Sequence, residues 1–254
     1  MRMSLPIREV VSKVPEVTLG FWIIKILATT LGETGGDTLS MSMGLGYLAA
    51  TAIFLLLFLL VVAAQIGARR FRPWLYWATI IATTTVGTTL ADFADRSLGI
   101  GYAGGSVLLL ALLLGTLFIW YRSQGSVAVD TVVSARSEAF YWSTILFSQT
   151  LGTALGDWTA DSSGLGYAAS ALVFGGLLAV VAGLYLRTRI SRTALFWAAF
   201  VLTRPLGAVV GDLLDKPVHE GGLALSRVAA SAALLGLIAA AIALLPQRPA
   251  ARAH

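Results

Sequence analysis

Four copies of one spacing place an acidic residue inside apolar sequence. In each copy a Gly follows a Trp after ten residues and an Asp follows the Gly after five: Trp22–Gly32–Asp37, Trp77–Gly87–Asp92, Trp142–Gly152–Asp157 and Trp197–Gly207–Asp212. A carboxylate within an apolar segment is costly and usually functional. Carboxylate oxygens bind hard cations such as Mg²⁺, Ca²⁺ and Mn²⁺, and neighbouring carboxyl groups readily exchange protons. The repeated aspartates therefore predict cation chemistry.

Each repeated Asp ends a row of side chains with helical spacing. Positions seven, eleven and fifteen after the Trp share one helix face, because they are four residues apart. The rows are Thr29–Glu33–Asp37, Thr84–Thr88–Asp92, Gln149–Thr153–Asp157 and Arg204–Ala208–Asp212. Such faces are expensive in lipid and should point at one another. We expect them to form a metal site from Glu33, Asp37, Asp92, Asp157, Asp212, Thr88 and Thr153.

Further charged residues lie close to these rows. Arg204 is on the fourth row, and Lys25 is in the first apolar segment. Each is a candidate gate or counter-charge; Arg204 could equally be half of a structural ion pair or an anion ligand. Asp95, Asp161 and Asp215 fall in the turns just beyond the rows. We expect these three to form an electronegative vestibule that concentrates cations.

The composition places these rows in a membrane. Hydrophobic residues make up 57% of the chain and charged residues only 12%, whereas soluble domains carry about 25% charged residues. About 20 apolar residues cross a bilayer as a helix, the economical structure where water is absent. The sequence predicts an all-α integral membrane protein with eight transmembrane helices near residues 17–39, 45–66, 73–94, 99–121, 139–160, 164–186, 192–213 and 222–245.

The eight predicted helices form four two-helix repeats of parallel orientation in a single membrane domain, residues 1–254. Approximate repeat boundaries are 17–70, 71–122, 137–190 and 191–246, with tails at 1–16 and 247–254. Gly-Leu-Gly-Tyr or Gly-Ile-Gly-Tyr follows the first three aspartates, and a degraded copy starts at Gly222. Even-numbered spans are nearly pure hydrocarbon. We therefore expect odd-numbered helices inside and even-numbered helices facing lipid.

Basic residues predict the orientation in the membrane. They occur in both tails and in the loops between repeats: Arg2, Arg8, Lys13, Arg69, Arg70, Arg72, Arg122, Arg136, Arg187, Arg189, Arg192, Arg248 and Arg252. The positive-inside rule then places both termini in the cytoplasm, in a bacterial inner membrane. The net charge of +5 is scattered over short loops, which disfavours nucleic-acid binding.

The Gly-Asp pairs, the Gly-Leu-Gly-Tyr signatures and the eight spans resemble a poorly characterised bacterial family of membrane-anchored proteins, over about residues 17–245. More loosely, Glu33-Thr-Gly-Gly-Asp37-Thr38 is similar to the Glu-x-Gly-Asp-Lys/Arg-Thr/Ser motif of manganese and calcium cation/proton exchangers. That similarity implies Glu33 and Asp37 as ligands with Thr38 nearby. Here an extra residue separates the acids, the basic residue is missing, and only the first repeat has the Glu.

These observations predict a multi-pass transporter of a small cation, Mn²⁺, Mg²⁺ or Ca²⁺ as substrate, with proton coupling as an option. Alternatives are a non-transporting scaffold or sensor subunit with structural aspartates, and a carrier of a small organic or anionic solute that uses Arg204. We expect no enzyme, because hydrolase motifs are missing and Thr34, Ala154 and Val209 break the Gly-x-Gly-Asp motif of intramembrane proteases. Expected partners are the lipid bilayer and the cation, with a homo-oligomer left open.

Overall fold

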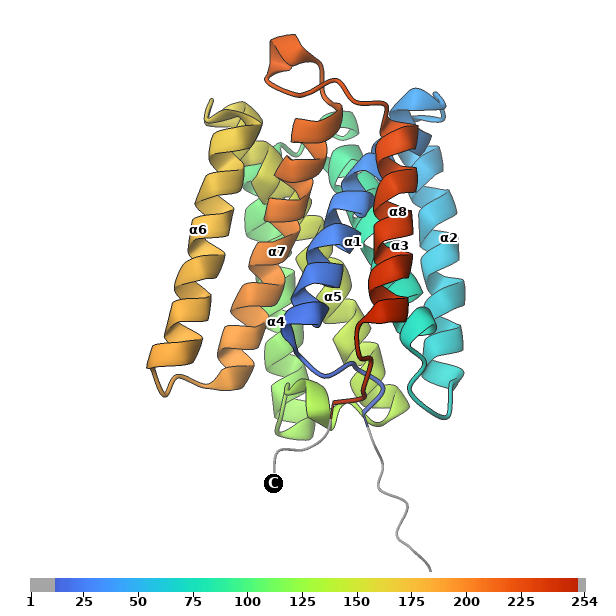
Figure 1. Ribbon diagram of the computed structural model, residues 1–254, viewed down its shortest axis with the longest axis vertical. Helices are drawn as coiled ribbons and strands as arrows, with labels where there is room; N and C mark the ends of the chain where they lie inside the picture. The colour runs from blue at the N-terminus through green and yellow to red at the C-terminus, as the bar shows by residue number, and fades with distance from the viewer. Residues whose placement is uncertain (1–11, 251–254) are drawn as a thin grey trace, which may run out of the picture.

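A computed structural model describes residues 12–250, which contain α-helices and no β-strand. Arg2, Arg8 and Arg252, with most of the predicted tails, lie outside the described residues. The helices are α1 (Leu19–Asp37), α2 (Gly46–Gly67), α3 (Pro73–Asp92), α4 (Tyr102–Gln124), α5 (Ala135–Asp157), α6 (Gly166–Arg187), α7 (Arg192–Asp215) and α8 (Arg227–Leu244). Figure 1 shows them as one upright bundle, with the segments next to both termini at the same end as the loops between repeats.

Local sequence explains where the odd-numbered helices begin. The side chains of Thr18 and Ser191 accept hydrogen bonds from backbone N–H groups in the first turns of α1 and α7. Ser134 does the same for α5 and forms a capping box with Ser137. Pro73 opens α3, where its missing N–H has no consequence. These caps satisfy donors that a helix end otherwise leaves free.

The odd-numbered helices of the first three repeats end at the repeated Asp. Each continues into a π-helical turn, at Thr38–Ser42, Phe93–Ser97 and Trp158–Ser162. The Gly-x-Gly-Tyr signature follows, and both of its glycines adopt positive φ, 69° and 74° for Gly44 and Gly46. Glycine is favoured there because a Cβ is strained in that conformation. The signature therefore reverses the chain between the two helices of a repeat.

The fourth repeat departs from this pattern. Helix α7 runs on to Asp215, and a loop with a short 3-10 turn delays α8 to Arg227, whereas the sequence predicts its start near residue 222. Its signature has lost the second glycine, and Ala224 stands in the loop with a φ of 52°. Lys216, directly after α7, and Arg227, the first residue of α8, both lie at the end of the bundle that holds the repeated aspartates.

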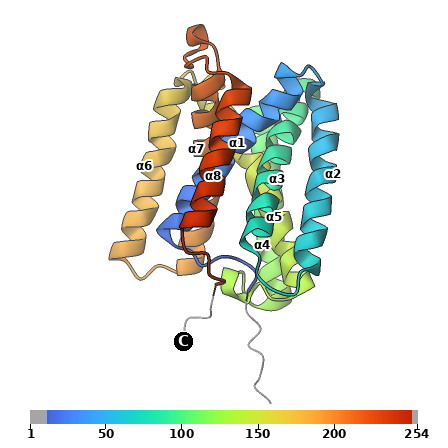
Figure 2. The same ribbon diagram turned by 45° about the vertical axis from the view of Figure 1, so that its right-hand side comes forward.

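Helices α1, α3, α5 and α7 form an inner ring. Each packs against the next, and α7 packs against α1, so that α1 lies opposite α5 and α3 opposite α7. Each even-numbered helix packs on the odd-numbered helix of the following repeat: α2 on α3, α4 on α5, α6 on α7, and α8 on α1. Figure 2 shows α2 and α6 on the outside of this ring. The repeats are thus interlocked rather than standing side by side.

Glycines allow the ring helices to approach closely. A Cβ built on the repeated Gly would collide with the polar row of the next helix: Gly32 with Thr84 at 2.4 Å, Gly87 with Gln149 at 2.9 Å, Gly152 with Arg204 at 2.2 Å, and Gly207 with Thr29 at 2.2 Å. The same contact recurs at all four interfaces. Small residues at helix crossings are typical of membrane bundles. The repeated Gly therefore sets the spacing of the ring.

Five helices, α2, α4, α6, α7 and α8, are long and apolar enough to cross a membrane. Their outer surfaces carry exposed apolar side chains such as Leu56, Val107 and Leu172, 60%, 70% and 77% exposed. An apolar surface of this extent would aggregate in water. These helices indicate a membrane protein. The more polar α1, α3 and α5 belong to the inner ring and are largely buried.

Candidate functional site

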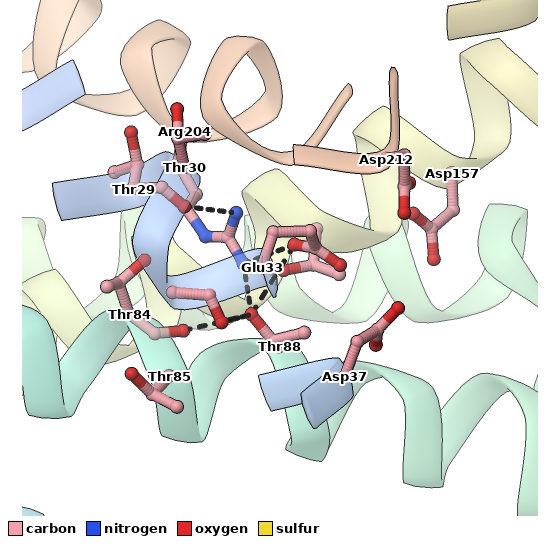
Figure 3. A network of polar contacts seen from close by, with 12 residues as sticks. Thr29, Thr30, Glu33, Asp37, Thr84, Thr85, Thr88, Asp157, Arg204 and Asp212 are labelled. Carbon is pink, nitrogen blue, oxygen red and sulfur yellow. Dashed lines mark hydrogen bonds and ion pairs between the residues drawn. The ribbon is translucent and has the colours of Figure 1, made fainter. Parts of the chain in front are cut away.

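Six buried carboxylates gather at the end of the ring opposite the termini. We call them the carboxylate cluster: Glu33, Asp37, Asp92, Asp157, Asp212 and Asp215. They come from all four inner helices. They form three overlapping groups, and within each group one oxygen of each residue lies within 4.8 Å of an oxygen of the other two: Glu33–Asp157–Asp212, Glu33–Asp37–Asp92 and Asp37–Asp212–Asp215. Figure 3 shows Glu33 between Arg204 and the pair Asp157 and Asp212. The structure thus brings all five sequence-predicted acids together.

Arg204 reaches the middle of the ring from α7. Its Nη2 donates to Glu33 Oε2 at 2.9 Å, on α1, and to Thr88 Oγ1 at 2.6 Å, on α3. It also donates to the hydroxyl of Thr153, on α5. One guanidinium therefore contacts the three other inner helices (Figure 3). Thr88 and Thr153, which the sequence predicts as neutral metal ligands, accept these hydrogen bonds from Arg204.

Lys25 does not reach the carboxylate cluster. Its Nζ lies 3.4 Å from Thr203 Oγ1 and 4.1 Å from the centre of the Phe200 ring. Asp37 lies twelve residues further along α1, which is about 18 Å of helix. Lys25 forms no ion pair with a carboxylate in residues 12–250. The structure places this predicted counter-charge outside the site.

Arg96 and Lys216 join the cluster from the turns that follow α3 and α7. Arg96 Nε is 3.0 Å from Asp92 Oδ1, and its Nη2 is 3.2 Å from Asp157 Oδ2. Lys216 Nζ is 3.0 Å from Asp37 Oδ2 and 3.2 Å from Asp212 Oδ1. Each cation thus bridges the Asp of its own repeat and the Asp of the next. The sequence-based site lacked both residues.

A sequence signal for these two cations exists. Arg96 and Lys216 each stand four residues after the repeated Asp, and the equivalent positions in the first and third repeats are Met41 and Asp161. Basic residues therefore alternate around the ring, from opposite repeats. An i, i+4 spacing lets each cation fold back onto its own Asp. The second contact, to the following repeat, depends on the order of helices in the ring.

The carboxylates keep both cations charged. Burial lowers the pKa of Arg96, but Asp92 and Asp157 outweigh it and raise the pKa above its usual value. Burial likewise lowers the pKa of Lys216, and Asp212 and Asp37 raise it overall. Lys216 therefore stays protonated across the physiological pH range.

The three outer acids have different surroundings. Asp161 is exposed and accepts a hydrogen bond of 3.2 Å from the Tyr167 hydroxyl. Asp95 is largely buried, and burial raises its pKa although Arg96 partly offsets this. Asp215 belongs to the carboxylate cluster and lies 3.3 Å from Arg227 Nε, a third basic residue that the sequence-based site lacked. Of the expected vestibule, only Asp161 faces solvent.

The cluster carries more acids than bases. Four cations pair with its six carboxylates: Arg96, Arg204, Lys216 and Arg227. This leaves a formal excess of two negative charges. Asp157 Oδ1 is buried without a hydrogen-bond partner in the described residues. Asp212 Oδ1 also lacks one, since its 3.2 Å approach to Lys216 has no hydrogen-bond geometry.

The donor set suits a hard cation. Every side chain of the cluster offers carboxylate oxygens. Oxygens bound to Mg²⁺ or Ca²⁺ lie about 2.0–2.6 Å from the ion, so oxygens on opposite sides of an ion are about 4–5 Å apart. The ligand oxygens of Glu33, Asp157 and Asp212 lie within 4.8 Å of one another, which is compatible with that span.

The fold and the long apolar helices define a membrane protein built from a four-fold internal repeat. Comparison with known families identifies the repeat: four copies of the family described as "Repeat of Unknown Function (DUF347)" match residues 20–71, 75–126, 140–191 and 195–246. The chain therefore belongs to this family. The match carries no link to the cation/proton exchangers that residues 33–38 resemble. No curated protein and no solved structure matches the chain.

Proposed function

We propose that this protein binds a small cation at the carboxylate cluster and carries it across the membrane. The observation that supports the proposal most is the formal excess of two carboxylates over the paired cations, at a site shielded from water. Burying a charge without a partner costs about several kcal/mol of desolvation free energy per ion. A divalent cation, or two protons, would balance the excess.

The chemistry of the donors favours a divalent ion. Glu33, Asp157 and Asp212 would be its central ligands, since two of their oxygens have no hydrogen-bond partner in the described residues. Asp37 and Asp92 would complete the site when Arg96 and Lys216 move. Oxygen ligands select Mg²⁺, Ca²⁺ or Mn²⁺ over softer metals. Protons compete for the same carboxylates, so cation binding would release protons and could couple the two fluxes.

The proposal includes all eight α-helices as membrane spans. Helices α1, α3 and α5 have 19, 20 and 23 residues, enough to cross about 30 Å of hydrocarbon. Their polar residues are enclosed by the other helices, which explains their lower hydropathy. Basic residues between the repeats lie at the end of the bundle that holds the terminal segments (Figure 1). With the positive-inside rule, this orientation gives cytoplasmic termini in a bacterial inner membrane.

A path beyond the cluster would run past Arg204. Buried polar atoms without a partner in the described residues continue there, on Thr84, Ser148 and Gln149. Nearer the termini an aromatic layer closes the ring, where the hydroxyls of Tyr76 and Tyr141 lie 2.7 Å apart. Transport therefore requires that Arg204 and this layer move.

A structural role is the second candidate. The ion pairs of Arg96, Arg204 and Lys216 join different repeats, and a scaffold would use them for this alone. Under that alternative the aspartates stabilise the bundle and no ion moves. A carrier of anionic solutes through Arg204 is less favoured, because Glu33 already neutralises that guanidinium.

Flux measurements in liposomes test the proposal. The protein is reconstituted and uptake of Mn²⁺, Mg²⁺ and Ca²⁺ is compared for the unmodified chain, Asp157→Asn and Asp130→Asn. Asp130 lies in the loop Val129–Thr131 at the other end of the bundle and serves as a matched control. We expect one ion to enter with the unmodified chain and the control, and at least about tenfold slower with Asp157→Asn. Equal flux for both variants, or flux no faster than in empty liposomes, would contradict the proposal.

A further inference from the structure

Arg96 and Lys216 lie between solvent and the carboxylates. The Arg96 side chain is 30% exposed, whereas Asp92 and Asp157, which it contacts, are each 2% exposed. Lys216 is 8% exposed and covers Asp37 and Asp212, 1% and 3% exposed. These two side chains therefore cover the four repeated aspartates at the outer end, and Arg227, 21% exposed and 3.8 Å from Asp37 Oδ2, lies beside Lys216 there.

The two cations act at equivalent places of an internal two-fold arrangement. Arg96 follows α3 and Lys216 follows α7, which face each other across the ring. Arg96 bridges the ends of α3 and α5, and Lys216 bridges the ends of α7 and α1. Together they occupy all four aspartates in two pairs. No aspartate of this ring remains without a tethered cation.

Their positions allow movement without unfolding of the helices. Arg96 stands in the π-helical turn Phe93–Ser97, and Lys216 is the first residue after α7. Long basic side chains in such places can swing out toward water. A mobile cation that enters from outside would compete with them for the same oxygens, since like charges at one site repel each other strongly.

We propose that Arg96 and Lys216 form an outer gate of two tethered cations that a divalent cation displaces when it enters the carboxylate cluster. The inference rests on the proposed function, and it assigns to these two residues the control of access. In the closed state they neutralise part of the carboxylate charge. The formal excess of two negative charges remains and attracts a cation from outside.

Thiol accessibility tests the gate independently of metal binding. The chain has no cysteine, so Ala208→Cys places a single thiol at the helical level of Glu33, below the gate. Ala208 is fully buried. A methanethiosulfonate with a trimethylammonium group is applied from outside. We expect labelling at least about tenfold faster when Arg96→Gln and Lys216→Gln are added. Arg122→Gln, an exposed cation at the other end, is the control and should change nothing.

Two substitutions that keep the charge show whether faster labelling comes from the lost charge or from a misfolded protein. With Arg96→Lys and Lys216→Arg added, which keep both charges, the thiol of Ala208→Cys should be labelled as slowly as in Ala208→Cys alone. In a misfolded bundle the thiol would be labelled quickly in every variant. The proposal would be wrong if the labelling rate did not change when both charges are removed, or if it rose equally with the charge-keeping substitutions.

Titration of Mn²⁺ into the same proteins separates the two proposals. Removal of one competing cation, in Arg96→Gln, should lower the Kd by about tenfold. If the thiol is labelled faster in the double Gln variant but none of the proteins binds Mn²⁺, Mg²⁺ or Ca²⁺, Arg96 and Lys216 restrict access and the cation site is rejected. Binding that is unaffected or weakened by Arg96→Gln would reject displacement of the gate and leave the site standing.

Discussion

Gly152 lies directly against the side chain of Arg204: a Cβ built on Gly152 would come within 2.2 Å of Arg204 Cγ. The absent side chain lets the guanidinium pass from α7 to Glu33 at the centre of the ring, where the two residues form a buried ion pair of 2.9 Å. The close contact at Gly152 thus positions the Arg204 guanidinium beside Glu33.

Gly152→Ala should displace Arg204 and loosen the α5–α7 contact. Overpacking of this kind costs about 1–3 kcal/mol, measured as a loss of thermal stability in detergent. Gly183→Ala, on the outer helix α6 with nothing within 4 Å of its Cβ, is the control and should be neutral or slightly stabilising. Equal effects of both changes would show that the close contact is not what requires glycine.

Glu33→Gln should be strongly destabilising because it leaves Arg204 buried without its carboxylate. Breaking one partner of a buried pair typically costs about 3–5 kcal/mol. Arg204→Met together with Glu33→Gln should recover part of that loss, because the unpaired guanidinium is then gone. Denaturation of the two single variants and the double variant measures the coupling. Strictly additive effects would contradict a direct ion pair.

Lys25→Met should raise stability and leave cation binding unchanged. The ammonium is fully buried, with one long hydrogen bond and the Phe200 ring as its only partners in the described residues. Met has a similar length and no charge to desolvate, so the expected gain is about 1 kcal/mol or more. Lys25→Arg keeps the charge and should bring no gain. If Lys25→Met abolished cation binding, Lys25 would belong to the site after all.

Asp95→Asn should stabilise the protein in a pH-dependent way. Burial raises the pKa of Asp95 in the folded state, so the fold favours the protonated carboxyl. Its ionised form therefore weakens the fold as pH rises from about 4, the usual pKa of an Asp. The melting temperature of Asp95→Asn should exceed that of the unmodified protein at pH 8 and approach it at low pH. A constant difference at all pH values would refute this assignment.

Periodicity and the four-fold spacing were sufficient to predict the all-helical membrane bundle and the acids at one level of it. A carboxylate that recurs at one helical position must recur at one height in parallel helices. Asp37, Asp92, Asp157 and Asp212 therefore belong to one carboxylate cluster although they are far apart in sequence.

Contacts between repeats could not be predicted in the same way. The sequence does not specify that each outer helix packs on the following repeat. Nor does it specify the order of the ring helices, on which the contact between Arg96 and Asp157 of α5 depends. Lys25 is buried against Thr203 and Phe200, and the sequence shows only that a cation lies in an apolar segment, not which groups face it. Arg227 opens α8 after the lengthened loop of the fourth repeat and approaches Asp215, a contact that the spacing of the other repeats does not indicate.

Isothermal titration of the purified protein with Mn²⁺, Mg²⁺ and Ca²⁺ tests the cation site most directly. Asp157→Asn removes one carboxylate of the group Glu33–Asp157–Asp212, and Asp37→Asn removes one that Lys216 covers. We expect saturable binding of at least one ion, abolished by Asp157→Asn and weakened by Asp37→Asn, with Asp130→Asn unchanged. Absence of binding, or binding that is indifferent to both substitutions, would contradict the assignment of these carboxylates to a cation site.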